Sequence, residues 1–207
     1  MNPDMPSPTA PADGEVPDLE LVKRCQAGDT RAFDALVTKY RGRVYNMTYH
    51  LIQNETEAWD LAQEAFIKAW RAIGGFKLDS GFYTWLYRIT HNVCYDWLRK
   101  KKIEGDGEFD DSRTDHRVAA GAEAVPQMVP RPDQAMKNAE LKVRIDAAIA
   151  QLSPDHRQAI LLKEVEGLRY HEIAEVMQCS LGTVMSRLFY ARKKLQEILK
   201  DTYENAA

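Results

Sequence analysis

The chain has 207 residues, of which 44% are hydrophobic and 29% charged, with a formal net charge of −3. This balance is typical of a soluble protein, and the length allows one large or two small domains with buried cores. No apolar run approaches the roughly 20 residues that a transmembrane helix needs, so we expect no membrane insertion. The cysteines, Cys25, Cys94 and Cys179, are odd in number and far apart. This argues against a disulfide framework or a Cys-x-x-Cys metal site and favours a reducing cytoplasm.

Residues 1–17 are rich in proline, alanine and acid, lack a signal-peptide pattern and predict a disordered tail. From residue 18 to residue 103, apolar residues recur at steps of three and four, which predicts one helical domain. Its first long helix carries a buried face from Phe33 to Leu51. A second helix ends at Gly74, and a third begins near Phe82 after a loop.

Residues 104–136 are rich in glycine, proline and acidic side chains without a sustained period, which predicts a flexible acidic linker. A second helical domain is expected over residues 137–201, with a short tail at 202–207. The fold class is therefore all-α, with two small helical domains joined by a linker. We expect a monomer.

The second domain is expected to begin with a helix that buries Leu141 and Ile145. Pro154 opens the next helix, because proline suits a first helical position. Val165 is expected on the apolar face of that helix, and Gly167 ends it.

The segment from Tyr170 to Lys194 has the outline of a helix-turn-helix, because an apolar-patterned helix runs into a short break before Ser180. Ser180 is a suitable N-cap for the second helix. That helix turns Val184 and Leu188 inward and leaves polar and basic residues outward, as a helix in the major groove of DNA does. An ordinary helical hairpin with a solvated basic face is the alternative.

One face of the second helix of the first domain combines acidic and amide groups with an apolar side chain. This mixture is more typical of a docking strip than of an idle surface, although a solvated face with one stray isoleucine is the simpler interpretation. The face carries Asp60, Gln63, Glu64, Ile67 and Arg71.

The third helix has a polar stripe at steps of three and four, and it ends in a run of lysines. Its cations suit phosphates, while its amide and carboxylate groups suit base edges. The stripe consists of Arg88, Asn92, Tyr95, Asp96, Arg99 and Lys100. Aromatic residues crowd the start of this helix and the preceding loop, and flat rings beside cations suit unstacked bases. Most of these rings are as easily core residues; we assign Phe82 to the core and expect Phe76, in the loop, to be available.

No catalytic or metal site is indicated by the sequence. The segment HEIAE at His171 lacks the second histidine of a zinc-protease helix, and His91 and Cys94 share a helix without a second ligand pair. Phosphate loops and nucleophile elbows are missing from the sequence. We therefore expect no enzyme activity, no metal and no cofactor.

Together these segments resemble the extracytoplasmic-function class of bacterial sigma factors. The runs DLAQEAFIKAW (Asp60–Trp70) and FYTWLYRITHNVCYDWLRKKK (Phe82–Lys102) are similar to that family's regions 2.2 and 2.3–2.4. The run from Leu152 to Leu195 is similar to its region 4. The three motifs in this order, with this linker, make the resemblance specific.

The resemblance implies a role for each face. The strip from Asp60 to Arg71 corresponds to the surface for the largest subunits of core RNA polymerase. The loop and third helix correspond to the reader of the −10 promoter element, which captures a flipped base; the residues concerned are Phe76, Lys77, Ser80, Trp85, Arg88, Asn92, Tyr95, Asp96, Arg99 and Lys100. The second helix of the helix-turn-helix corresponds to the reader of the −35 element, with Thr183, Met185, Ser186, Arg187, Tyr190, Arg192 and Lys193. An anti-sigma partner is also implied.

One residue departs from the family pattern. Met185 stands where the family usually carries lysine or arginine. An apolar side chain can touch a thymine methyl group but cannot grip guanine or phosphate. A different −35 preference is therefore expected, or a larger share of the contact for Ser186 and Arg187.

Two other classes compete with this interpretation. A stand-alone helix-turn-helix regulator would leave the Asp60 strip and the aromatic loop without a role, and it would usually need a dimer to read a two-fold site. A metal-dependent nucleic-acid enzyme could use Asp60 and Glu64, which share a helix face, but no partner ligand is visible in the sequence.

Overall fold

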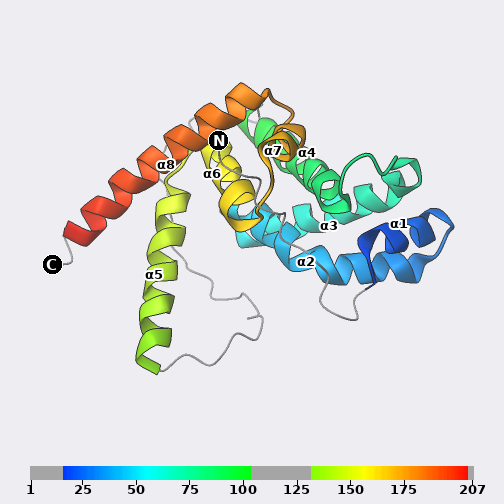
Figure 1. Ribbon diagram of the computed structural model, residues 1–207, viewed down its shortest axis with the longest axis horizontal. Coiled ribbons are helices and arrows are strands. Elements are labelled where there is room, and N and C mark those ends of the chain that lie inside the picture. The colour runs from blue at the N-terminus through cyan, green and yellow to red at the C-terminus, as the bar shows by residue number, and fades with distance from the viewer. Residues whose placement is uncertain (1–15, 104–131, 205–207) are drawn as a thin grey trace, which may run out of the picture.

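The computed structural model describes residues 16–103 and 132–204, and the described part is helical (Figure 1). The predicted N-terminal tail and most of the predicted linker lie outside the described residues. The linker was expected to extend to residue 136, but helix α5 already begins at Pro132, so this boundary was wrong by a few residues.

The N-terminal domain consists of α1 (Asp18–Gln26), α2 (Thr30–Ile52), α3 (Glu55–Ala72), the short turn η1 (Ile73–Gly75) and α4 (Phe82–Ile103). Polar side chains start the two middle helices. Asp29 accepts a hydrogen bond from the backbone N–H of Arg31 at 3.0 Å, and Asn54 accepts one from Glu57 at 3.1 Å. The predicted all-helical domain, with a third helix beginning at Phe82, is confirmed.

The C-terminal domain consists of α5 (Pro132–Ala150), α6 (Pro154–Ile160), the π-helical turn η2 (Leu161–Val165), α7 (Tyr170–Val176) and α8 (Leu181–Glu204). Gly167, with a φ of 69°, stands in the left-handed region and ends the segment after η2, as predicted. Helices α7 and α8 form the helix-turn-helix.

The expected burial of Val165 was wrong. Its side chain is 68% exposed, whereas the neighbouring Leu162 and Leu168 are buried. The cause is the wide turn η2, in which the N–H of Glu166 bonds to the carbonyl of Leu161, five residues back. The extra residue in that turn rotates Val165 out of the apolar face.

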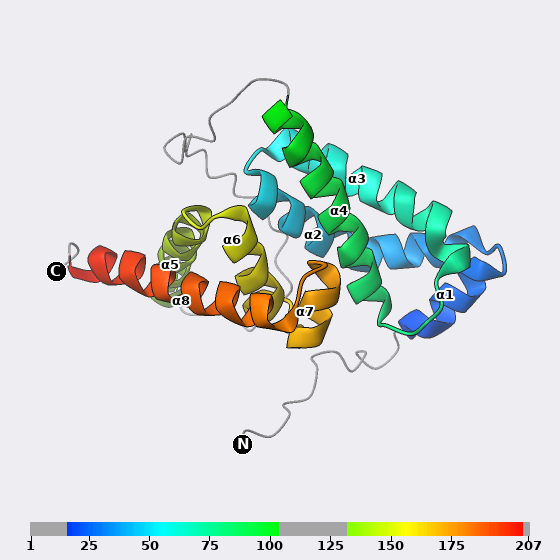
Figure 2. The same ribbon diagram turned by 90° about the horizontal axis from the view of Figure 1, so that it is seen from above.

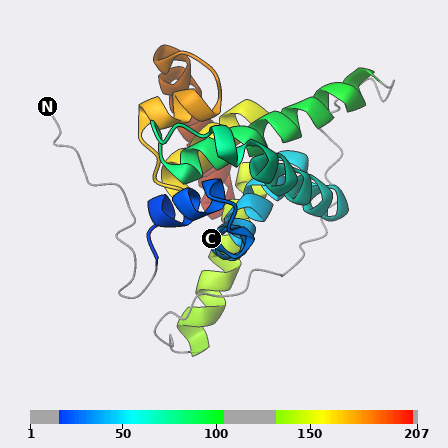
Figure 3. The same cartoon turned by 90° about the vertical axis from the view of Figure 1, so that its right-hand side faces the viewer.

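Helix α5 was expected to bury Leu141 and Ile145, and this was also wrong. These side chains are 41% and 39% exposed, and among the residues of α5 whose side chains the structure describes, Ala148 and Ile149 near its end are the buried ones. The reason is visible in the architecture: α5 projects from the body on the side away from α7 (Figure 3).

The two domains pack against each other. Helix α4 lies beside α7, and α2 contacts α6 (Figure 2). Buried apolar side chains of both domains form one continuous cluster. The described arrangement is therefore a closed body rather than two separate units.

Arg157 is a buried cation that joins α6 to the ends of α5 and α2. It is 5% exposed, and its guanidinium donates to the carbonyls of Ile149 at 3.1 Å and Leu152 at 2.8 Å. It also donates to the carbonyl of His50, near the end of α2, at 2.6 Å. Because helix C-termini leave carbonyls without partners, one arginine here satisfies acceptors from both domains.

Replacing Arg157 with alanine should lower the free energy of unfolding by roughly 3 kcal/mol, because it removes several hydrogen bonds from a buried guanidinium to backbone carbonyls, including the one to the buried Leu152. Arg157→Lys, which keeps the charge but lacks the planar fork, should lose part of that amount. Urea denaturation of the full chain measures the free energy of unfolding of both variants. An alanine variant as stable as wild type would show that these bonds do not hold the domain together.

Candidate nucleic-acid interface

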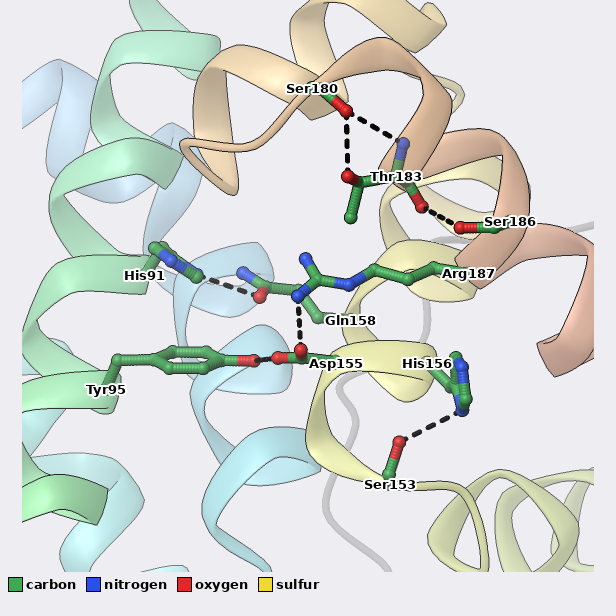
Figure 4. Close-up of polar contacts among 10 residues, drawn as sticks. All are labelled: His91, Tyr95, Ser153, Asp155, His156, Gln158, Ser180, Thr183, Ser186 and Arg187. Atoms are coloured by element: carbon green, nitrogen blue, oxygen red, sulfur yellow. Dashed lines mark hydrogen bonds and ion pairs between the residues drawn. The ribbon is translucent and has the colours of Figure 1, made fainter.

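The recognition helix of the helix-turn-helix is α8, and its start is fixed by a side-chain cap. The hydroxyl of Ser180 accepts a hydrogen bond from the backbone N–H of Thr183 at 3.1 Å (Figure 4), as predicted. Val184 and Leu188 are buried, also as predicted. The opposite face of the helix is therefore presented to solvent.

That outward face is apolar over its first turns. Leu181, Met185 and Phe189 follow each other at steps of four and are 45%, 47% and 63% exposed. Tyr190 beside them is 56% exposed. Ser186 donates its hydroxyl to the carbonyl of Thr183 at 2.9 Å, so its donor is used within the helix.

The arginines of α8 are engaged inside their own domain. Arg187 forms an ion pair with Asp155 (Figure 4), and Arg192 forms one with Glu164 at 2.7 Å. Thr183 is half-buried, and Lys193 is exposed. The predicted −35 residues thus lie along one helix, but its free face is less basic than the sequence suggested.

The polar stripe of α4 is divided between two environments. Arg88 donates to Glu175 of α7 at 3.2 Å, and the side-chain amide of Gln178 donates to Asn92. Tyr95 donates to Asp155 of α6. In contrast, Asp96 and Arg99 pair with each other at 2.8 Å and are exposed to solvent to a large extent, and Lys100 is exposed.

Further contacts between α4 and the C-terminal domain involve side chains for which the sequence predicted no contact with that domain. Tyr83 donates to Glu172 at 2.9 Å, and Tyr87 donates to Glu166 at 2.6 Å. Nδ1 of His91 lies 2.8 Å from Oε1 of Gln158 (Figure 4). These pairs join residues far apart in sequence, so no local pattern could have found them.

Burial shapes the ionisation of this interface. Desolvation, followed by the carboxylate of Glu172, raises the pKa of Tyr83 to about 12. Desolvation also raises the pKa of Glu166, and the hydrogen bond from Tyr87 opposes that rise. Both tyrosines therefore remain hydroxyl donors at neutral pH.

The expectation that Phe76 is available was wrong. Its side chain is 7% exposed and stacks on Trp85, with ring centroids 4.8 Å apart. Trp85 is also buried, at 6% exposure, because both rings complete the core between the loop and α4. A cavity of about 410 Å³ lies beside them, lined by Gly75, Phe76, Lys77, Asp79, Ser80, Trp85, Arg88 and Glu175.

The predicted docking strip lies on the free face of α3. All five of its residues, Asp60, Gln63, Glu64, Ile67 and Arg71, are exposed, and Ile67 is 51% exposed. Glu64 pairs with Lys68 at 2.8 Å, one turn along the helix. Trp59 is 48% exposed, and its ring centroid lies 4.4 Å from that of Tyr45; it extends this surface and was not among the predicted residues.

The fold and these faces define a two-domain, all-helical protein with a C-terminal helix-turn-helix. Residues 36–103 match the family described as Sigma-70 region 2, and residues 142–195 match the family described as Sigma-70, region 4. The chain is 41% identical over 189 residues to RNA polymerase sigma-H factor of Pseudomonas aeruginosa, covering 91% of this chain and 97% of that protein. The chain belongs to the extracytoplasmic-function class of sigma-70 family RNA polymerase sigma factors.

Other relatives agree with this assignment. The ECF RNA polymerase sigma-E factor of Escherichia coli K12 is 37% identical over 182 residues, covering 87% of this chain and 93% of that protein. The sigma factor RpoE from Bartonella quintana, solved in complex with the anti-sigma factor NepR, superposes with a TM-score of 0.62 at 28% identity. That match covers 81% of this chain and 96% of the solved one. CnrH, solved with the cytosolic domain of CnrY, shares the fold with a TM-score of 0.61 at 24% identity, covering 89% and 97% of the two chains.

Among the described residues, no helix is both long enough and apolar enough to cross a membrane.

Acid should lower the free energy of unfolding through His91. Desolvation lowers the pKa of this histidine, and the positive charge of Arg187 adds to that effect. The hydrogen bond with Gln158 and the charge of Asp155 oppose it only in part. Because the folded state binds this proton less readily than the unfolded state, stability is fully present above the ordinary histidine pKa of about 6.5 and is lost as the pH falls below it. The free energy of unfolding should therefore fall between pH 7.5 and pH 5.5 by more in wild type than in His91→Asn.

The exposed His171 offers a matched control, since His171→Asn should retain the wild-type pH dependence. Urea denaturation at the two pH values measures all three proteins. If the free energy of unfolding depends on pH equally in wild type and in His91→Asn, His91 is not the cause of the loss of stability in acid.

Proposed function

We propose that this chain is a dissociable promoter-specificity subunit of bacterial RNA polymerase. It docks on core polymerase through the α3 strip, reads the −35 element as duplex through α8, and reads the −10 element through α4 and the loop before it. The observation that supports this most directly is the pair of family matches, one in each domain, in the order of regions 2 and 4. The chain is not itself an enzyme, and it works in the cytoplasm under the control of an anti-sigma protein.

Within this proposal each domain contributes a different kind of contact. At α4, the solvent-exposed Arg99 and Lys100 supply phosphate attraction, and Asn92 supplies a base-reading amide. At α8, Lys193 supplies phosphate attraction beside the apolar face. Two linked modules raise each other's effective concentration, so neither has to bind DNA tightly alone.

The α3 strip suits a protein partner better than DNA. Its exposed carboxylates would repel phosphates, whereas acidic and amide groups around Ile67 give a mixed polar and apolar contact. A helix with this face exposed beside the equally exposed Trp59 offers a continuous docking surface. We assign it to the largest subunits of the polymerase.

The double variant Asp60→Arg/Glu64→Arg should lose stable association with bacterial core RNA polymerase, by at least about tenfold in affinity, because charge reversal opposes a complementary surface. Co-purification and titration with purified core polymerase measure this. Glu20→Arg/Asp34→Arg, which reverses two exposed acids on α1 and α2, serves as the matched control. Equal binding by wild type and the α3 variant would contradict the docking role of the strip.

We further assign −35 reading to the apolar face of α8. Leu181, Met185 and Phe189 are exposed, while Arg187 and Arg192 are held by carboxylates of their own domain. Apolar side chains in the major groove distinguish thymine by its C5-methyl group. The −35 element of this protein should therefore owe part of its specificity to thymine methyl groups.

Replacing thymine with uracil removes only the methyl group and tests this assignment. Duplexes selected with the full chain from a randomised pool should bind about fourfold more weakly for each contacted thymine converted to uracil, the loss expected for one buried methyl-sized group. Met185→Ala should reduce that discrimination, whereas Lys193→Ala should weaken both duplexes equally. If wild type binds the thymine and uracil duplexes with equal affinity, α8 does not recognise thymine methyl groups.

A further inference from the structure

We propose that a hollow where α5, α6 and α8 meet is a proton-linked binding site for one phosphate group of the DNA backbone, at the flank of the −35 element. The hollow has a volume of about 380 Å³ and is lined by Gln151, Leu152, Ser153, His156, Tyr190, Lys193, Lys194 and Glu197. This inference rests on the proposed −35 role of α8. It adds Ser153, His156 and Lys194 to the residues that contact the duplex.

The cations of α8 divide into two groups. Arg187 and Arg192 are each paired with a carboxylate of their own domain. In contrast, Lys193 and Lys194 are exposed, and neither forms an ion pair with any other residue that the structure describes. Because phosphate attraction supplies a large share of the affinity of a protein for DNA, we expect α8 to obtain that share from these two lysines.

The two lysines lie beyond the turns of α8 that we assign to base reading. Eight residues separate Leu181 from Phe189, which is a length of about 12 Å along the helix axis. The major groove of B-DNA is also about 12 Å wide. Lys193 and Lys194 follow Phe189 by four and five residues, roughly 6 to 8 Å further along the axis. A helix whose apolar turns fill the groove therefore brings these lysines to the phosphates at its edge.

The start of α6 supplies further hydrogen-bonding groups on the opposite wall of the hollow. Nδ1 of His156 lies 3.0 Å from Oγ of Ser153, which leaves Nε2 as the ring nitrogen for a ligand (Figure 4). The half-buried ring of His156 lies beside that of Tyr190 of α8, with centroids 6.4 Å apart. Imidazole, hydroxyl and ammonium groups all donate to phosphate oxygens, so the walls converge on one anion.

The protonation of His156 sets the strength of this site. Neutral imidazole donates from one nitrogen, whereas imidazolium donates from both and carries a positive charge. The charged and titratable side chains near this ring, on α8 and on its own helix, are Tyr190, Lys193, Lys194, Glu197 and the adjacent Asp155. The two lysines disfavour a third positive charge, and a bound phosphate offsets their effect. Binding of DNA should therefore be accompanied by proton uptake at His156 and should strengthen as the pH falls.

Glu197 opposes the cations of the hollow. Its carboxylate is exposed on α8, one turn after Lys193, and it repels a phosphate. Two lysines against one glutamate still leave the lining positive when His156 is neutral. An anion is therefore the ligand that this lining favours, and removal of the Glu197 charge should tighten its binding.

Phosphate scanning locates the contact on a duplex selected with the full chain. Replacing single backbone phosphates with neutral methylphosphonate should weaken wild-type binding about fivefold at one or two adjacent positions beside the base-read segment. Lys194→Ala should bind the unmodified duplex about fivefold more weakly, lower the slope of log K against log salt by about 0.9, and lose its sensitivity to those positions. Lys142→Ala, which removes an exposed lysine of α5 outside the hollow, is the matched control and should retain wild-type behaviour.

Two further variants test the chemistry of the hollow. Between pH 7.5 and pH 5.5, wild type should gain about fivefold more affinity for the duplex than His156→Asn does. Titration calorimetry in buffers of different ionisation enthalpy should show proton uptake that His156→Asn loses. Glu197→Gln should bind about threefold more tightly than wild type at both pH values. Circular dichroism of each variant verifies that it is folded.

Several results would overturn the inference, each in a different way. Equal losses for wild type and Lys194→Ala at every methylphosphonate position would show that the hollow holds no backbone phosphate. Equal pH dependence and proton uptake in wild type and His156→Asn would remove the proton linkage. Saturable binding of inorganic phosphate without DNA, combined with insensitivity to methylphosphonate, would assign the hollow to a free ion. Failure of wild type to bind any duplex would instead contradict the proposed −35 role of α8 itself, and with it this site.

Discussion

The arrangement of this protein depends on partly buried carboxylates that accept hydrogen bonds from the other domain. Glu166 follows the turn η2 and is withdrawn from water, and the hydroxyl of Tyr87 is the donor that α4 supplies. Loss of this donor would destabilise the packed domains by about 1 kcal/mol or more, because the carboxylate is already partly desolvated. Glu172 has two roles, because one oxygen accepts from the backbone N–H of Arg169 at the start of α7 and the other accepts from Tyr83. The start of the helix-turn-helix and its position on α4 are therefore set by the same side chain.

Features governed by neighbouring residues could be predicted from the sequence. Ser180 as the cap of α8, Gly167 as the end of the preceding segment and the inward Val184 and Leu188 follow from local rules, and the structure has each of them. The exposure of Val165 could not be predicted, because a single extra residue in a π-helical turn changes which side chains lie on the apolar face. The exposure of Leu141 and Ile145 has a related reason: their spacing is helical, but spacing does not reveal whether another element covers that face.

The same distinction between local patterns and distant contacts applies to the candidate sites. The exposure of the α3 strip could be predicted, because helical periodicity alone indicates which face of a helix is turned away from the core. The polar character of the α4 face could be predicted too, but its partners in the C-terminal domain could not, because each bond joins residues 60 to 89 positions apart. The prediction that Phe76 is exposed was wrong for a different reason. A loop residue is usually exposed, but here the ring of Trp85 provides an apolar neighbour that draws it into the core.

The polar face of α4 limits how this protein can change. Arg88 bonds to Glu175, and Asn92 accepts from Gln178, so a substitution at either position also alters the contact between the two domains. Redesigning this face of α4 therefore means redesigning the facing residues of the C-terminal domain with it.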